Sequence, residues 1–355
     1  MHLYIPVTVY SETQCVRNHA QQLRALGTKA MLVTGRHSAV HSGALADVIA
    51  ALEDTPYLIF DRIEENPSVE TVMQARDIAI ANQVDFFIGI GGGSPMDAAK
   101  AIALMSANPE QTETVLYTAA PLAHYPVACV PTTCGTGSEV TPYAILTRHA
   151  HRTKKSISHK IFPALALLDA KYLKTMSRTG LVNTCVDALA HLLESYLNTN
   201  SNDLNRLYSR EGLRQWGVFK DRLLTDTLEE ADYARMLHAS MIAGMAITHT
   251  GTSLPHGLSY PVTYELGVPH GRAVGLFLGG FVESYGDAGQ AVQAAQLLGL
   301  DSPHALREYL RQLLGVTEVP CELLQTAAEK ILSDPGKLKN YPYPITAEAL
   351  IAMAN

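Results

Sequence analysis

Short apolar runs alternate with longer amphipathic segments over the first half of the chain. The amphipathic segments, at residues 38–52 and 68–82, have helical spacing, and each falls between two apolar runs. Alternation of this kind predicts a mostly parallel sheet with helices on both faces. The runs expected as strands are residues 30–34, 57–60, 86–90, 126–130 and 164–168.

The second half has a different texture. From about residue 177 the strand-like runs stop, and Ala, Leu, Glu and Met dominate helical segments that Pro or Gly separates. We therefore expect an α/β domain over residues 1–175 and an all-helical domain over residues 176–355. No Gly/Ser-rich linker stands between them, so the junction is direct, and a cleft between domains is the usual place for a ligand.

Composition excludes several classes of protein. The 355 residues are 47% hydrophobic with a net charge of −7, which is typical of a globular enzyme and argues against nucleic acid as a partner. The longest apolar run, residues 273–281, is too short to span a bilayer. The N-terminus shows no basic region or cleavage site, and the five Cys form no Cys-x-x-Cys pair, so we expect a cytoplasmic protein.

Four residues of the helical half could bind a metal. Asp187 and His191 are four apart in a run without Pro or Gly, so they project from one face of a helix. His256 and His270 each stand in a Pro-His-Gly phrase. One carboxylate and three imidazoles suit a first-row divalent ion. The chain has 14 His, however, and Asp-x-x-x-His also occurs by chance.

A Gly-rich turn follows the expected strand at 86–90. Gly91, Gly92 and Gly93 precede Ser94, which we expect to cap a helix that begins at Pro95. Exposed N–H groups at such a helix start favour a phosphate group. The turn matches neither the standard dinucleotide fingerprint nor a P-loop, so an ordinary Gly-rich connection is the alternative.

Together these features resemble a known family. The Gly-rich turn is followed by Pro-Thr-Thr-Cys-Gly-Thr-Gly-Ser-Glu at residues 131–139, then by the Asp187 and His191 pair and the two Pro-His-Gly phrases. In this order and spacing they resemble the iron-containing (group III) alcohol dehydrogenases over essentially the whole chain. The resemblance implies an α/β dinucleotide-binding domain, an all-helical metal domain, and reversible hydride transfer between an alcohol and NAD(P), usually with Fe²⁺ and sometimes with Zn²⁺.

The resemblance also assigns roles to particular residues. It implies that Asp187, His191, His256 and His270 bind the metal, and that Lys154 or Lys155 contacts the nicotinamide half of the cofactor. We also expect a homodimer and a small alcohol or aldehyde as substrate. The residues implied for the pyrophosphate and adjacent ribose are Gly91, Gly92, Gly93, Ser94 and Asp97, and those lining the cofactor are Thr132, Thr133 and Thr136.

One position departs from the family pattern. The family often has a second His four residues after the third ligand, where it is a candidate proton relay, and here that residue is Tyr260. A Tyr hydroxyl could relay a proton only with a pKa below its usual value of about 10. Tyr260 is therefore either a catalytic residue or part of the pocket wall.

Cofactor choice can be read from the end of the second strand. NAD-binding folds place an acidic residue there to bind the ribose 2′-hydroxyl. Here Gly35, Arg36 and Ser38 supply space, positive charge and a hydroxyl instead, which favours NADP(H) over NAD(H). An Arg36 side chain that points to solvent is the alternative.

Other functions fit parts of the pattern. A lyase related to dehydroquinate synthase would use a similar two-domain plan with NAD and a metal, although the phrase at 131–139 speaks against it. A metal-dependent hydrolase could use the same ligands without a nucleotide. A non-catalytic nucleotide-binding protein could retain the fold alone.

Overall fold

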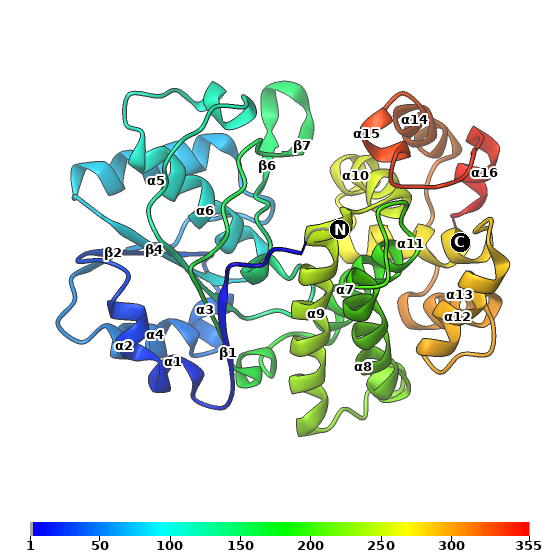
Figure 1. Cartoon of the computed structure of the whole chain (residues 1–355), viewed down its shortest axis with the longest axis horizontal. Coiled ribbons are helices and arrows are strands. Elements are labelled where there is room, and N and C mark those ends of the chain that lie inside the picture. The colour runs from blue at the N-terminus through cyan, green and yellow to red at the C-terminus, as the bar shows by residue number, and fades with distance from the viewer. Residues whose placement is uncertain (1–2, 355) are drawn as a thin grey trace. The chain divides into compact units, whose positions relative to one another are not determined.

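The computed structural model describes residues 3–354 and divides them into two compact units (Figure 1). One unit, the α/β unit, comprises residues 5–133 and 137–176. The other, the helical unit, comprises residues 177–354 together with 3–4 and 134–136. Residues 134–136 of the phrase at 131–139 therefore belong to the helical unit.

A parallel sheet of six strands forms the centre of the α/β unit, in the order β1-β8-β5-β4-β2-β3. A separate antiparallel hairpin pairs β6 (Ile145–Arg148) with β7 (Thr153–Ser156). Both the hairpin and β1 lie outside the expected strands. The sheet strands are β1 (Thr8–Ser11), β2 (Ala30–Thr34), β3 (Tyr57–Phe60), β4 (Phe86–Gly91), β5 (Val127–Pro131) and β8 (Leu165–Leu168).

Helices cover both faces of this sheet because alternate residues of each strand point to opposite sides. Val33 and Phe87 enter the core beneath α5 (Val69–Ala81) and α6 (Gly93–Ala107), whereas Leu32 enters the core on the other face. Figure 1 shows the two helical layers with the sheet between them. The helices of the second face are α1 (Cys15–Asn18), α2 (Ala20–Arg24), α3 (Ser38–His41) and α4 (Ala44–Leu52).

The helix expected over 38–52 is two helices. Gly43, with φ +81°, ends α3 and precedes α4, since a left-handed residue cannot continue a helix. Short 3₁₀ turns complete the unit at η1 (Glu113–Tyr117), η2 (Ser138–Val140), η3 (His149–His151) and η4 (Ala170–Leu173).

The helical unit is built from ten helices in residues 177–354, and no strand occurs in that range. None of the helices in residues 3–354 combines the length and hydropathy needed to cross a bilayer. The parallel sheet of one unit and the all-helical build of the other confirm the predicted fold class. The helices are α7 (Arg178–Tyr196), α8 (Asn205–Thr225), α9 (Glu230–Thr250), α10 (Leu254–Leu266), α11 (His270–Glu283), α12 (Ala288–Leu297), α13 (Pro303–Leu314), α14 (Cys321–Leu332), α15 (Pro335–Leu338) and α16 (Ala347–Ala352).

Helices α7 and α11 approach each other at backbone distance. A Cβ atom built on Gly271 would lie 1.8 Å from the carbonyl oxygen of Asn183, and one on Gly275 would lie 2.8 Å from Val186 Cγ1. Any larger residue at 271 would push the helices apart. This explains why a glycine follows His270, which the close approach brings towards α7.

Gly271→Ala should therefore destabilise the helical unit. We expect the free energy of unfolding in denaturant to fall by about 3 kcal/mol, the upper end for overpacking, because the clash is with backbone. Gly267→Ala is the matched control: Gly267 has φ +65° but no atom within 4 Å of its Cβ position, so only left-handed strain of about 1 kcal/mol is expected. Equal losses in the two variants would contradict this account of the packing.

Candidate functional site

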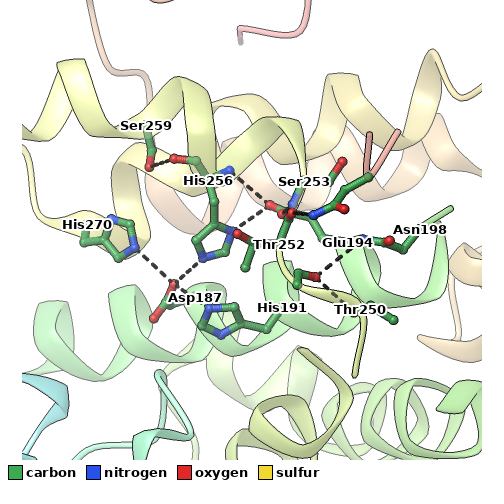
Figure 2. Close-up of polar contacts among 12 residues, drawn as sticks. Asp187, His191, Glu194, Asn198, Thr250, Thr252, Ser253, His256, Ser259 and His270 are labelled. Carbon is green, nitrogen blue, oxygen red and sulfur yellow. Dashed lines mark hydrogen bonds and ion pairs between the residues drawn. The ribbon is translucent and has the colours of Figure 1, made fainter. Parts of the chain in front are cut away.

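Three imidazoles converge on the carboxylate of Asp187 in the helical unit (Figure 2). Asp187 Oδ1 lies 3.4 Å from His256 Nε2, 3.7 Å from His270 Nε2 and 3.9 Å from His191 Nε2. Ligand atoms of Asp187, His256 and His270 all lie within 4.8 Å of one another; His191 is outside that group but stacks on the His256 ring at 4.5 Å between centroids. The four predicted ligands are thus brought together from α7, α10 and α11.

The polar atoms of this cluster fit a cation. Asp187 and His256 are buried, and in the described part of the chain neither Asp187 Oδ1 nor His256 Nε2 makes a hydrogen bond. Burying such groups without a hydrogen bond is unfavourable. A divalent ion among one carboxylate and several imidazoles would satisfy them, and this donor set suits iron or zinc.

Two further groups orient the imidazole rings. His256 Nδ1 donates to Glu194 Oε1 at 2.7 Å, and His191 Nδ1 donates to the carbonyl oxygen of Gly135 at 3.2 Å. Carboxylate and carbonyl oxygens only accept, so each Nδ1 carries a proton and each Nε2 faces the centre of the cluster, where a metal ion would take the place of any proton on it. Sequence reasoning missed Glu194, although it stands seven residues after Asp187 and so on the same face of α7.

The electrostatics of the cluster favour positive charge. Burial alone would raise the pKa of the Asp187 carboxyl, but His191, His256 and His270 hold that pKa well below its usual range. Burial opposes charge on His256, yet Glu194 and Asp187 raise its pKa to about 10. Burial likewise lowers the pKa of His191. The two buried carboxylates therefore create a site that attracts a cation.

Tyr260 lies beside this cluster. It follows His256 by about one turn of α10, and its ring stacks on that of His270 with centroids 5.9 Å apart and an interplanar angle of 20°. The residue is partly buried. The structure thus places Tyr260 next to a candidate ligand.

The Gly-rich turn lies in the α/β unit where β4 meets α6. Gly91 has φ +147°, and a Cβ atom on Gly92 would lie 3.2 Å from Thr133 Oγ1. Helix α6 begins at Gly93, so the expectation that Ser94 caps it and that Pro95 opens it is wrong. The Ser94 hydroxyl instead accepts the backbone N–H of Asn66 at 3.1 Å.

Asp97 and Lys100 fasten the segment that follows β5. The Asp97 carboxylate accepts from Ser138 Oγ at 2.5 Å and from Ile145 N at 2.8 Å. Lys100, fully buried, donates to Ser138 O at 2.8 Å and to the carbonyl oxygen of Tyr143 at 2.8 Å, and lies 3.5 Å from Asp97. Asp97 therefore holds protein groups in place. Lys100 was missed, since a buried lysine has no signature in the sequence.

The predicted threonines are divided between the units. Thr132 N donates to Gly91 O at 2.8 Å, and the buried Thr132 hydroxyl makes no hydrogen bond in the described chain. Thr133 adjoins Gly92, as noted above, so both residues border the Gly-rich turn. Thr136, in contrast, belongs to the helical unit. An unpartnered buried hydroxyl at this edge is a candidate ligand contact.

The remaining predicted cofactor residues border the same edge of the sheet. Because Thr34 of β2 pairs with Ile90 of β4, the adjoining Gly35 reaches the carboxyl end of the sheet near the Gly-rich turn. Arg36 and Ser38 are exposed there.

Lys154 joins this region through a residue that sequence reasoning missed. Its Nζ donates to Asn66 Oδ1 at 2.7 Å, and Asn66 N donates to Ser94. Lys155 lies 5.9 Å from the ring centroid of Tyr117 instead. Of the two lysines, Lys154 is the one linked to the turn.

Family models match nearly all of the chain. The model described as iron-containing alcohol dehydrogenase matches residues 6–170, and the C-terminal model of the Fe-containing alcohol dehydrogenase family matches residues 181–338. The chain belongs to the iron-containing alcohol dehydrogenase family. Membership supports an oxidoreductase that acts on small alcohols or aldehydes, with a metal and a nicotinamide cofactor.

Individual relatives agree with this assignment. The mitochondrial hydroxyacid-oxoacid transhydrogenase of Caenorhabditis elegans is 30% identical over 338 residues, which cover 82% of this chain and 72% of the relative. The NADPH-dependent butanol dehydrogenase of Clostridium saccharobutylicum is 28% identical, covering 73% and 68%.

Solved structures share the fold over the full length. A crystal structure of an iron-containing alcohol dehydrogenase has a TM-score of 0.91 at 34% identity, covering 99% of this chain and 97% of that one. The iron-containing alcohol dehydrogenase of Thermotoga maritima has a TM-score of 0.90 at 33% identity, covering 99% and 98%.

A buried acid follows Ser138 in the phrase that ends at residue 139. Glu139 is 1% exposed, and its Oε1 makes no hydrogen bond within residues 3–354. Burial raises the pKa of this carboxyl to about 7, although Lys100 favours its charged form. Ionising Glu139 in the folded chain is therefore costly.

The stability of the α/β unit should depend on pH through Glu139. The folded pKa lies above the unfolded one, so the folded chain binds the extra proton between about pH 4.5 and 7, and stability falls as pH rises through that window. Between those pH values, the free energy of unfolding of wild type should fall by about 3 kcal/mol relative to that of Glu139→Gln, as measured by denaturant unfolding. Parallel pH profiles would contradict this, and the exposed Glu113→Gln variant serves as control.

Proposed function

We propose that this chain is a metal-dependent, NAD(P)-linked alcohol dehydrogenase or aldehyde reductase, with NADP(H) preferred. The observation that carries the proposal is the convergence of three imidazoles on the buried, unsatisfied carboxylate oxygen of Asp187. A lyase or a hydrolase on the same plan would leave the nicotinamide absorbance unchanged over turnover. The test is that absorbance, followed with NADPH and NADH, a panel of short aldehydes, and protein loaded anaerobically with Fe²⁺ or Zn²⁺.

Asp187, His191, His256 and His270 would hold the ion, Fe²⁺ or alternatively Zn²⁺. A divalent ion there supplies Lewis acidity towards a substrate oxygen. The chain's own contribution is to turn the His256 and His191 rings so that Nε2 faces the ion, through Glu194 and the carbonyl oxygen of Gly135.

The Gly-rich turn would bind the cofactor pyrophosphate. Gly91 and Gly92 leave the backbone open to close approach, and the N–H groups at the start of α6 favour a negative group. The free hydroxyl of Thr132 supports a further contact at this edge. Arg36, exposed beyond Gly35, supports recognition of a 2′-phosphate.

Tyr260 would exchange a proton with the substrate oxygen. The proposal is supported by the position of Tyr260 about one turn after His256 on α10 and by the stacking of its ring on that of His270.

Loss of a metal ligand should separate catalysis from nucleotide binding. We expect His256→Ala or His270→Ala to reduce kcat roughly a thousandfold or more, because metal charge stabilisation is worth several kcal/mol, while NADPH affinity changes little. Gly92→Val should instead weaken NADPH binding, since its Cβ position is already tight against Thr133. Titration followed by NADPH fluorescence measures the affinity. Equal loss of NADPH binding in all three variants would contradict this division of roles.

Gly35→Asp should shift preference from NADPH towards NADH. A carboxylate would repel the 2′-phosphate, and one charge-assisted contact is worth roughly 1.5–3 kcal/mol, or about tenfold to a hundredfold in the ratio of kcat/KM values. Gly35→Ala is the matched control, since a Cβ there already comes within 3.1 Å of the Ile63 carbonyl oxygen. A wild-type enzyme that favours NADH would refute the preference.

Tyr260→Phe should keep the stacking on His270 and remove only the hydroxyl. If Tyr260 moves the proton, kcat should fall roughly a hundredfold. Tyr264→Phe, one turn further along α10, is the control. Unchanged kcat in Tyr260→Phe would assign Tyr260 to the pocket wall.

A further inference from the structure

Every residue of the connection between α9 and α10 has a backbone group that is hydrogen-bonded to a side chain. It runs from Thr250, the last residue of α9, to Ser253, just before α10, and His256 follows within the first turn of α10. Three consecutive backbone carbonyls of this connection accept from side-chain amides, and the next backbone N–H donates to a carboxylate. The contacts are Asn200 Nδ2 to Thr250 O at 3.2 Å, Asn198 Nδ2 to Gly251 O at 3.4 Å, Asn340 Nδ2 to Thr252 O at 2.7 Å, and Ser253 N to Glu194 Oε2.

The amides also hold one another. Asn200 Nδ2 donates to Asn340 Oδ1 at 3.1 Å, and Asn200 N donates to Asn198 Oδ1 at 3.0 Å. Asn198 and Asn340 are buried. Gly251, with φ +72°, has no spare room, because a Cβ atom there would lie 3.0 Å from Asn340 Nδ2. These contacts therefore restrain the conformation of the connection.

Glu194 joins this connection to the proposed metal ligand. One of its oxygens accepts from Ser253 N, and the other accepts both His256 N, at 3.1 Å, and His256 Nδ1, at 2.7 Å. Glu194 is fully buried. A shift of the connection would thus be transmitted directly to the His256 ring, as the contacts drawn in Figure 2 indicate.

We propose that Glu194 and Asn340 are positioning residues that set the metal affinity of the centre by preordering the α9–α10 connection. This rests on the proposed role of His256 as a ligand. Asn340 lies far along the chain, after α15, and so makes metal binding depend on the C-terminal segment. Without these contacts, the ion would have to order the connection as it binds, which weakens affinity.

The test is metal affinity of the full-length chain, measured by competition with a chromophoric chelator for Zn²⁺. Asn340→Asp keeps the shape and the bond from Asn200 but cannot donate to Thr252. Glu194→Gln keeps the shape but loses an acceptor and the charge. We expect the dissociation constant to rise roughly tenfold to a hundredfold in each, the usual effect of removing a group that orients a ligand.

Asn108→Asp is the matched control. Asn108 is 8% exposed in the α/β unit, and its Nδ2 donates to the carbonyl oxygens of Leu104 and Ala123. The Asn108→Asp substitution should lower the Tm of the metal-free chain without changing its zinc affinity. If Asn340→Asp does not fold, Asn198→Asp, which loses the hydrogen bond to Gly251 O, replaces it. The expected rise in the dissociation constant for zinc is the same.

The outcomes separate this inference from the proposed function. If wild type binds one zinc ion, and Glu194→Gln and the Asn340 or Asn198 variant bind it with the same affinity, the positioning role alone is overturned. A wild-type chain that binds no ion overturns the proposed centre together with this inference. Weaker binding in these variants, with normal binding in Asn108→Asp, supports it.

Discussion

The buried carboxylate of Asp187 is the constraint on which the helical unit depends. A carboxylate oxygen surrounded by imidazole nitrogens, with no hydrogen bond of its own, is unfavourable unless a cation is present. The closest packing in the unit serves this arrangement, because Gly271 lets α11 approach α7 at backbone distance. Glu194 adds a second buried negative charge behind His256, which makes the pair of carboxylates a match for a divalent ion.

The proposed function places a different demand on the α/β unit, which would have to leave backbone groups free at the Gly-rich turn. The Gly-rich turn keeps the start of α6 open, while Asp97 and Lys100 satisfy each other and the segment after β5 from within the same helix. Both charged residues, although they stand near the turn proposed to bind phosphate, thus hold the protein rather than a ligand. Asn66 has a similar part, since it links Ser94 to Lys154.

Local pattern carried most of the fold and the centre of the site. Alternation of apolar runs is sufficient for a parallel sheet, and the four-residue spacing of Asp187 and His191 fixes a shared helical face. The two Pro-His-Gly phrases indicated His256 and His270, and the family resemblance joined all four residues into one ligand set.

What could not be predicted depends on contacts between distant segments. The Ser94 hydroxyl accepts from Asn66, a residue distant in the sequence, instead of capping α6. Strand β1 was missed because a short edge strand is defined by its pairing with β8. Glu194 and Asn340 are ordinary polar residues in the sequence. Only burial beside the α9–α10 connection gives them a role.

The most direct measurement is the anomalous scattering of crystals grown anaerobically with Fe²⁺. The account predicts one iron peak per chain, roughly 2.0–2.3 Å from an Asp187 carboxylate oxygen and from the Nε2 atoms of His191, His256 and His270. An iron peak held by other residues, or imidazoles that remain unligated in the presence of excess iron, would contradict it.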